Sequence, residues 1–326
     1  MQNTYTYEDA EDLVFGIERA LAGVGVKIEP GSIFEECCLT ILRLAARYRG
    51  EHPVVGNDED VRVAHRNFVG LADFAAKLHS VSQTSAFAGL KAHLALLNSR
   101  AVVQNTKSEQ ADEANNKLFE LYLACLCIAA GATEVRLDSP KNAKGDNPDV
   151  IATFDGVVWG FACKALHSAD PRALTRNLAK AINQIERAPV TVGIPVLSLK
   201  NVLPHDELWF ATDDPNAPGD FIFTAYPSSS TPVSMMHDFV ERLQEAFVEF
   251  ETPANILSMF AGKKSVPAFL SLSSTVTATL MNEAVVPTRL NLATLHRIEA
   301  LDGAAQSVID RLHYQFQVLV PPPVRP

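Results

Sequence analysis

The stretch NPDVIATFDGVVWGFACKAL, residues 147–166, decides the fold. It contains two runs rich in β-branched and aromatic residues, PDVIATF and VVWGFACKAL, and such runs predict β-strands. The pair Asp155-Gly156 between the runs is typical of a tight hairpin turn. The stretch therefore predicts a hairpin of two antiparallel strands, and the neighbouring elements can be placed outward from it.

Four further segments surround the predicted hairpin. They are a helix over 117–130, a short strand over 132–137, a helix from Asp170-Pro171 to about Ala188, and a strand over 190–199. The helix over 117–130 is predicted from an apolar run that ends at a glycine. The helix from Asp170-Pro171 begins with Asp as N-cap and Pro in the first turn. The segment over 190–199 is almost wholly apolar, as expected of a strand buried on both faces. This order predicts an α/β unit.

The rest of the chain is predicted to form two further parts around a core over 106–230. Residues 1–105 show helical spacing of apolar residues and predict a helical domain, and residues 231–326 predict an α+β segment that can complete the core. The shorter segments are predicted as follows: strands over 207–211, 221–226 and 266–276, a helix over 232–251, and mainly helix over 288–317.

Composition limits the classes of function. The hydrophobic fraction is 47%, typical of a globular protein, and no apolar run reaches the roughly 18 residues that a membrane span needs. The N-terminus lacks the features of a secretory signal, and the five cysteines show no zinc-ligand spacing. These features predict a cytoplasmic protein with free thiols and no membrane partner.

Charge is distributed unevenly along the chain. The net charge of -10 argues against indiscriminate nucleic-acid binding. Residues 141–200, however, hold eight Lys and Arg against five Asp and Glu, a net charge of +3. Either this excess is chance, or this stretch contacts an anionic partner.

Four positions in the same stretch carry a resemblance to a known family. They are Glu120 in NKLFELYL, Pro148-Asp149 in NPDVIATF, Lys164 in GFACKAL and Gln184 in AINQIER. Together with the order of elements, they resemble the active-site motif of the PD-(D/E)XK phosphodiesterases, over about residues 115–200. The resemblance implies an α/β fold of the restriction-endonuclease-like kind, a mixed sheet flanked by helices, here preceded by an all-helical domain.

The resemblance also implies a chemistry. It is that of a metal-dependent endonuclease of restriction or phage defence, acting on DNA in preference to RNA. Phosphodiester hydrolysis needs a cation that offsets phosphate charge and activates water, and Mg²⁺ (or Mn²⁺) prefers oxygen ligands. Asp149, Glu120 and the main-chain carbonyl of Cys163 are the implied metal ligands. Lys164 is the implied stabiliser of developing charge, and Gln184 is an implied polar residue of the site.

One position departs from the family pattern. Side-chain alternation places four residues on one face of the second hairpin strand: Gly160, Ala162, Lys164 and Leu166. The acid of the family motif would stand at 162, where this chain has an alanine. Because alanine cannot ligate a cation, we expect Mg²⁺ binding to be weak or absent.

Three explanations of Ala162 are open. A carboxylate can arrive from elsewhere, with Glu120 and Glu186 as the candidates in the core. The chain can be a natural nuclease-like protein that binds without cutting. The alanine can also be an engineered inactivation. The second explanation leads to the alternative function, a non-catalytic nuclease-like module for nucleic-acid or protein binding and assembly. A protein partner or self-association would then involve the helical domain.

The predicted helix after the hairpin shows two stripes. Leu174, Leu178, Ile182 and Ile185 make an apolar stripe that should pack on the sheet, whereas Arg172, Arg176, Lys180 and Gln184 recur every four residues. The second stripe is either an ordinary solvated face or a ridge that follows a phosphate backbone. On the second interpretation, Arg172, Arg176 and Lys180 are the nucleic-acid-binding residues.

Overall fold

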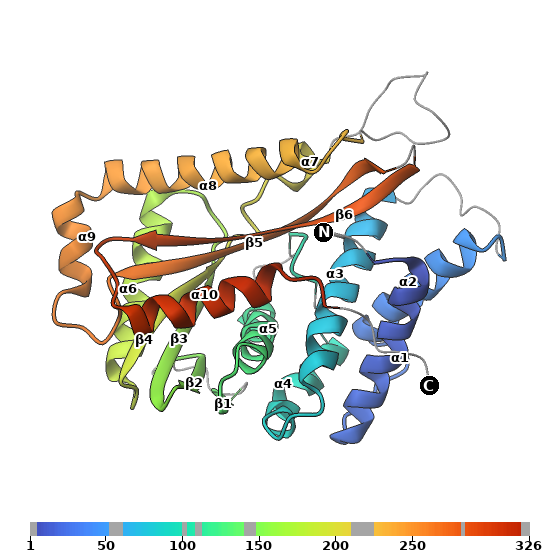
Figure 1. The fold of residues 1–326 in the computed structure, drawn as a ribbon, viewed down its shortest axis with the longest axis horizontal. Coiled ribbons are helices and arrows are strands. Elements are labelled where there is room, and N and C mark those ends of the chain that lie inside the picture. Colours follow the sequence, from blue (N-terminus) through green and yellow to red (C-terminus); the bar gives the residue numbers. More distant parts are fainter. Residues whose placement is uncertain are drawn as a thin grey trace.

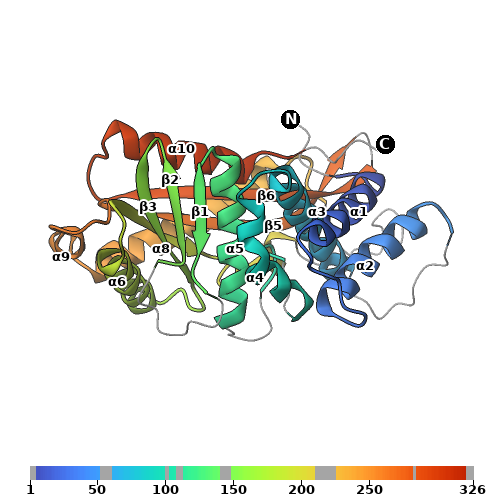
Figure 2. The same ribbon diagram turned by 90° about the horizontal axis from the view of Figure 1, so that it is seen from below.

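The computed structural model describes residues 5–51, 61–99, 103–107, 113–139, 148–209, 225–281 and 284–320. Within these ranges the protein is mixed α/β, with one six-stranded mixed sheet and ten α-helices. Figures 1 and 2 show the sheet between helices, with the N-terminal helices at one end of the molecule. None of the described helices is both long and apolar enough to span a bilayer.

The strands follow one another in the sheet in chain order. They are β1 (Glu134–Leu137), β2 (Val150–Phe154), β3 (Val157–Ala165), β4 (Val192–Ser198), β5 (Ala268–Met281) and β6 (Ala284–Arg297). The β3–β4 and β4–β5 pairs are parallel, and the other neighbours are antiparallel. The strands at both edges therefore pair with their neighbours in antiparallel orientation.

The predicted β2–β3 hairpin is confirmed. Asp155 and Gly156 join its strands with φ values of 51° and 81°. Left-handed backbone at both central turn positions gives the twist that a two-residue hairpin needs, and Asp and Gly tolerate it best.

The helices are α1 (Tyr7–Gly23), α2 (Ile33–Tyr48), α3 (Val61–Val81), α4 (Lys91–Leu94), α5 (Glu113–Ala129), α6 (Pro171–Arg187), α7 (His205–Leu208), α8 (Ser230–Phe250), α9 (Pro253–Phe260) and α10 (Gly303–Gln317). Helices α3, α5 and α10 share a hydrophobic core with one face of the sheet, and α6, α8 and α9 share another with the opposite face. In Figure 1, α8 and α10 lie on either side of the β5–β6 ribbon.

Helix α6 is the crossover between the parallel strands β3 and β4, as a parallel connection requires. Its start confirms the predicted cap, because the Asp170 Oδ1 atom accepts a hydrogen bond of 2.9 Å from the Arg172 backbone N–H. The predicted apolar stripe from Leu174 to Ile185 is buried. The helix is therefore held by both its cap and its inner face.

Strand β4 confirms another prediction, burial on both faces. Its side chains alternate between the two hydrophobic cores: Ile194 and Val196 lie in the core with α5, and Leu197 lies in the core with α6 and α8. Its central position in the sheet explains the apolar run in the sequence.

One prediction in the C-terminal third is wrong. Residues 288–297 belong to strand β6 instead of a helix, although α10 confirms the helix after them. Leu290 and Leu292 pack on the α8 side, and Ala293 and Leu295 pack on the opposite side. A strand with apolar residues on both faces also has apolar pairs three residues apart, which imitate helical spacing.

The strand predicted over 207–211 is wrong at its start, where Glu207 and Leu208 belong to α7. Residues 210–211, and 221–224 of the next predicted strand, lie outside the described residues. Tyr226 forms an isolated parallel bridge with Thr279 of β5.

A buried ion cluster connects the N-terminal helices to the sheet. Asp73 on α3 pairs with Arg289 of β6 and with Lys77, whose Nζ atom lies 3.4 Å away. The Asp73 Oδ2 atom also accepts a 2.9 Å hydrogen bond from the Tyr122 hydroxyl on α5. Residues from three distant parts of the chain are thus joined in one polar core.

Candidate functional site

The candidate site lies where β2 begins and β3 ends. Asp149 immediately precedes β2, and the β2–β3 register, continued by one pair, places it opposite Ala162. The Asp149 Oδ2 atom accepts a 2.7 Å hydrogen bond from the Cys163 backbone N–H and lies 3.4 Å from the Lys164 Nζ atom. Asp149 and Lys164, which the resemblance assigns to one site, therefore lie in contact, while their roles stay predictions.

Lys164 is only partly exposed, with 18% of its side chain accessible. Its Nζ atom also donates a 3.0 Å hydrogen bond to the Cys163 carbonyl. The carbonyl that was predicted as a metal ligand therefore already accepts a hydrogen bond from the lysine of the same motif. A cation at this carbonyl would have to share it with the ammonium or displace it.

Glu120 reaches the site from α5 on the neighbouring layer. Its side chain is 2% exposed, and the Lys117 Nζ atom lies 3.0 Å from each of its two oxygens. Burial raises the pKa of Glu120, and the charge of Asp149 raises it further, against the opposing ammonium groups of Lys117 and Lys164. The carboxyl is thus within the electrostatic influence of the Asp149–Lys164 pair.

Two residues of this cluster were missed in the sequence. Lys117 carried a usable signal, because a lysine three residues before a glutamate on a helix can pair with it. His93 carried none. It belongs to α4, is buried, and its Nε2 atom lies 3.5 Å from the Glu120 Oε2 atom. Burial and the nearby Lys117 charge lower the pKa of His93 to about 4, so the ring is neutral at pH 7.

Ala162 points into an apolar environment. It is completely buried in a small cluster with Ala181, Ile185, Ala188 and Val190, on the α6 side of the sheet. Position 162, where the resemblance implies an acid, is therefore closed by packed side chains. A carboxylate placed there would lie against apolar groups of α6.

The two candidates for a replacement carboxylate differ in position. The Glu186 Oε2 atom accepts a 2.9 Å hydrogen bond from the Lys264 backbone N–H, in the segment that leads into β5. Glu120 instead shares the environment of Asp149 and Lys164. Of the two candidates, only Glu120 is placed to serve the site.

The predicted polar stripe of α6 is divided. Arg172, Arg176 and Lys180 are exposed, whereas Gln184 is buried, next to Ile185 of the small cluster around Ala162. A helix turns about 100° per residue, so positions four apart drift by about 40° per step and by about 120° over three steps. This drift carries Gln184 from the solvated face toward the sheet. A role for Gln184 stays a prediction.

The possible metal-ligand atoms of the site are oxygens, the type that a hard cation prefers. Asp149, Glu120 and the Cys163 carbonyl offer oxygens, which Mg²⁺ prefers. Both carboxylates, however, already contact ammonium groups.

Among the described residues, three ligand atoms of His, Cys, Asp or Glu come within 4.8 Å of one another only at His237, Asp238 and Glu241. That group lies exposed on α8, and exposed acidic groups of this kind are common without a metal. His93, Glu120 and Asp149 do not form such a triplet.

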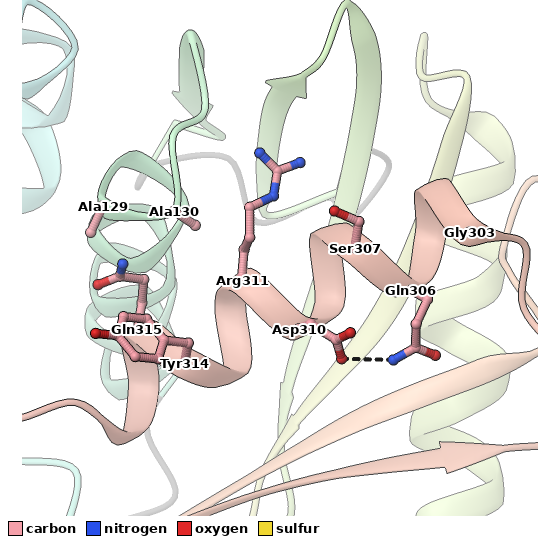
Figure 3. A pocket seen from close by; sticks show the side chains of 9 residues that line it. All are labelled: Ala129, Ala130, Gly303, Gln306, Ser307, Asp310, Arg311, Tyr314 and Gln315. Carbon is pink, nitrogen blue, oxygen red and sulfur yellow. Dashed lines mark hydrogen bonds between the residues drawn. The ribbon is translucent and has the colours of Figure 1, made fainter.

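A surface pocket lies at the C-terminal end of α5, away from Glu120 in the middle of that helix. Figure 3 shows it between the end of α5, at Ala129 and Ala130, and α10. Asp310 accepts a 2.7 Å hydrogen bond from Gln306 within it, and Tyr314 is largely exposed. None of the predicted site residues lines this pocket.

Comparison of the chain with protein-family models, with curated proteins and with solved structures gives no match.

Proposed function

We propose that the chain is a PD-(D/E)XK-like nuclease that hydrolyses phosphodiester bonds in DNA with Mg²⁺ or Mn²⁺, in restriction or phage defence. The observation that carries the proposal is the contact of Asp149 with Lys164 across the β2–β3 hairpin, 3.4 Å between the carboxylate and the ammonium. The order of α5, β1, β2, β3, α6 and β4 supports a restriction-endonuclease-like core. Buried Glu120 supplies the second carboxylate that Ala162 does not.

In this proposal each residue of the site has a distinct role. Asp149, Glu120 and the Cys163 carbonyl would hold the cation, and a bound cation would supply activation of water and compensation of phosphate charge. Lys164, partly exposed beside Asp149, orients the phosphate or stabilises developing negative charge. Buried Gln184 supports the site from α6.

Exposed charge on α6 supports nucleic acid as the substrate. Arg172, Arg176 and Lys180 are solvated on the helix that directly follows β3. A series of cationic side chains beside a phosphodiesterase site can contact successive phosphates of a nucleic-acid strand, because phosphate contacts position a protein on nucleic acid.

A second candidate is a nuclease-like module that binds nucleic acid or a protein without cutting. The packing of Ala162 favours it, since the place of the missing acid is filled by apolar side chains. Binding without hydrolysis needs the ammonium of Lys164 and the α6 cations but no complete metal site.

Cleavage assays distinguish the two candidates. Supercoiled plasmid, duplex and single-stranded oligonucleotides and RNA are incubated with the chain in Mg²⁺ or Mn²⁺. The nuclease proposal expects cleavage of DNA by the parent chain and its loss in Asp149→Asn and Lys164→Met. Glu241→Gln on α8, far from the site in sequence, is the matched control and should cleave like the parent.

DNA binding without cleavage by the parent chain in either metal supports the non-catalytic module. Neither binding nor cleavage with any of these nucleic acids rejects the nuclease and leaves a protein partner as the ligand. Cleavage that persists unchanged in Asp149→Asn would place the activity outside this site.

A further inference from the structure

The charges of the candidate site are balanced in pairs. Asp149 contacts the ammonium of Lys164 at 3.4 Å, and Glu120 contacts the ammonium of Lys117 at 3.0 Å through both of its oxygens. The other neighbour of Glu120, His93, is a ring with one close nitrogen at 3.5 Å. Two carboxylates and two lysines therefore satisfy each other's charge without a metal ion.

Lys117 occupies the face of Glu120 that a cation would use. Because its Nζ atom is equally close to both oxygens, the ammonium stands where a divalent ion would bridge or chelate the carboxylate. A Mg²⁺ ion that entered beside two neutralised pairs would leave a net charge of about +2 in a poorly solvated site, which is costly. The cost falls if an anion enters with the metal or if Lys117 leaves.

Lys117 is able to leave. Its side chain is 15% exposed, whereas that of Glu120 is 2% exposed, so the lysine lies on the solvent side of the pair. It also lies in the first turns of α5, and its long flexible side chain has rotamers that reach water. A phosphate arriving at the site would be a better-placed partner for the displaced ammonium than bulk water.

We propose that Lys117 is an internal counter-ion that blocks divalent cations from Glu120 until a phosphate enters, so that metal and nucleic acid bind together. The inference rests on the proposed function in taking Glu120 and Asp149 as the metal ligands. It adds a new residue, Lys117, and an order of binding: the free protein holds little metal, and the phosphate of the nucleic acid completes the site.

Manganese binding tests the inference without relying on activity. Mn²⁺ is titrated into the parent chain and into Lys117→Met, and free Mn²⁺ is followed by electron paramagnetic resonance, with and without a duplex oligonucleotide of phosphorothioate linkages. We expect the duplex to tighten Mn²⁺ binding by the parent at least about tenfold. Lys117→Met should bind Mn²⁺ at least about tenfold more tightly than the parent without any duplex.

Matched variants separate charge from structure. Lys117→Arg keeps the charge and should behave like the parent, and Lys117→Met with Glu120→Gln should return to weak binding because the ligand is gone. If Lys117→Met does not fold, as judged by circular dichroism, Lys117→Gln carries the same expectation with a hydrogen-bonding side chain. Equal Mn²⁺ affinity of the parent and of the folded neutral variant, whether weak or strong, overturns the inference.

The two proposals fail in different ways. DNA-dependent Mn²⁺ binding in a parent chain that never cleaves DNA would reject the nuclease and keep the role of Lys117. Cleavage by a parent chain whose Mn²⁺ affinity is independent of Lys117 and of DNA would reject this inference alone.

Discussion

Two buried carboxylates, Asp73 and Glu120, show opposite electrostatic behaviour. Burial favours the neutral form of Asp73, but Arg289, Lys77 and the Tyr122 hydroxyl outweigh burial, and its pKa lies below the ordinary value. For Glu120, burial and the Asp149 charge prevail, and its pKa lies above the ordinary value. The cations around Asp73 outweigh its burial, whereas the ion pair of Glu120 with Lys117 does not outweigh the burial of Glu120.

The surroundings explain the difference. The cations around Asp73 are themselves fixed, because Arg289 donates to the carbonyl of Gln317 and Lys77 donates to that of Val318, just after α10. The lysines around the candidate site are both partly exposed. A buried ion cluster with fixed donors suits a structural role, whereas a buried carboxylate with a raised pKa, beside partly exposed lysines where β2 begins and β3 ends, suits ligand binding.

The largest effect on stability should follow from breaking the buried ion cluster around Asp73. Asp73→Ala leaves Arg289 and Lys77 buried without their counter-charge, and we expect it to lower the free energy of unfolding by about 3–5 kcal/mol. Urea denaturation followed by circular dichroism measures the loss. Glu120→Gln is the comparison variant and should not lower the free energy of unfolding at neutral pH, because burial already disfavours the ionised carboxylate and a neutral group of similar shape replaces it. Equal losses would remove the distinction between the two clusters.

A somewhat smaller effect is expected at Ala162, which is enclosed by apolar side chains. Ala162→Glu puts a larger, charged side chain among the apolar groups around Ala181 and Ile185, and should cost about 2–4 kcal/mol. Millimolar Mn²⁺ should recover part of the loss, because the new carboxylate lies on the same face of β3 as Lys164. Calorimetry should show tighter Mg²⁺ binding than in the parent.

The control for this prediction is Ala162→Leu, which adds similar bulk but no ligand. It should lose similar stability without any recovery in Mn²⁺. Strong and equal Mg²⁺ affinity in the parent and in Ala162→Glu would place the metal ligands elsewhere.

The same comparison shows which parts of the site could be predicted from the sequence. Asp149 and Lys164 were predictable, because a tight turn at Asp155-Gly156 sets the pairing of two adjacent strands and alternation then sets the faces. Lys117 was predictable in principle from helical spacing. His93 was not, since its contact with Glu120 depends on the packing of α4 against α5, which no local pattern encodes.

The fold shows the same division between local and tertiary causes. Helix α6 and the β2–β3 hairpin follow from a cap and a turn within a few residues. Strand β6 was mistaken for helix because both of its faces are buried, a fact that depends on α8 and on the core of the opposite face. The Asp73–Arg289 pair, which joins α3 to β6, had no signal in the sequence at all.

A third, smaller effect distinguishes the two carboxylates by pH. Because the pKa of Glu120 is raised on folding, its contribution to stability is complete below about pH 4.5 and is lost progressively as the pH rises. Glu120→Gln should therefore be more stable than the parent at pH 8, by at least about 1 kcal/mol, and should lose this advantage toward pH 4. Thermal unfolding over this pH range measures the difference.

Asp73 should act with the opposite sign. Its pKa is lowered on folding, so its contribution is present above about pH 3.8 and is lost as the pH falls below that value. A parent chain whose stability does not decline relative to Glu120→Gln between pH 5 and pH 8 would contradict a raised pKa of Glu120.

The smallest effect on stability, and a large effect on binding, is expected from the exposed cations of α6. Arg172, Arg176 and Lys180 are solvated, so their joint reversal to Glu should change the free energy of unfolding by less than about 1 kcal/mol. If they contact phosphates, DNA affinity should fall steeply, and the slope of log affinity against log salt should shrink by about 3, since each phosphate contact contributes roughly 0.9. Fluorescence anisotropy with a labelled duplex at several salt concentrations measures both quantities.

Reversal of Arg19, Lys27 and Arg43, which are exposed on or beside α1 and α2, changes the net charge equally and should leave the slope unchanged. Equal loss in both triple variants would mean that net charge, and not the α6 cations, sets the affinity, whereas loss only in the second would assign DNA recognition to the N-terminal helices.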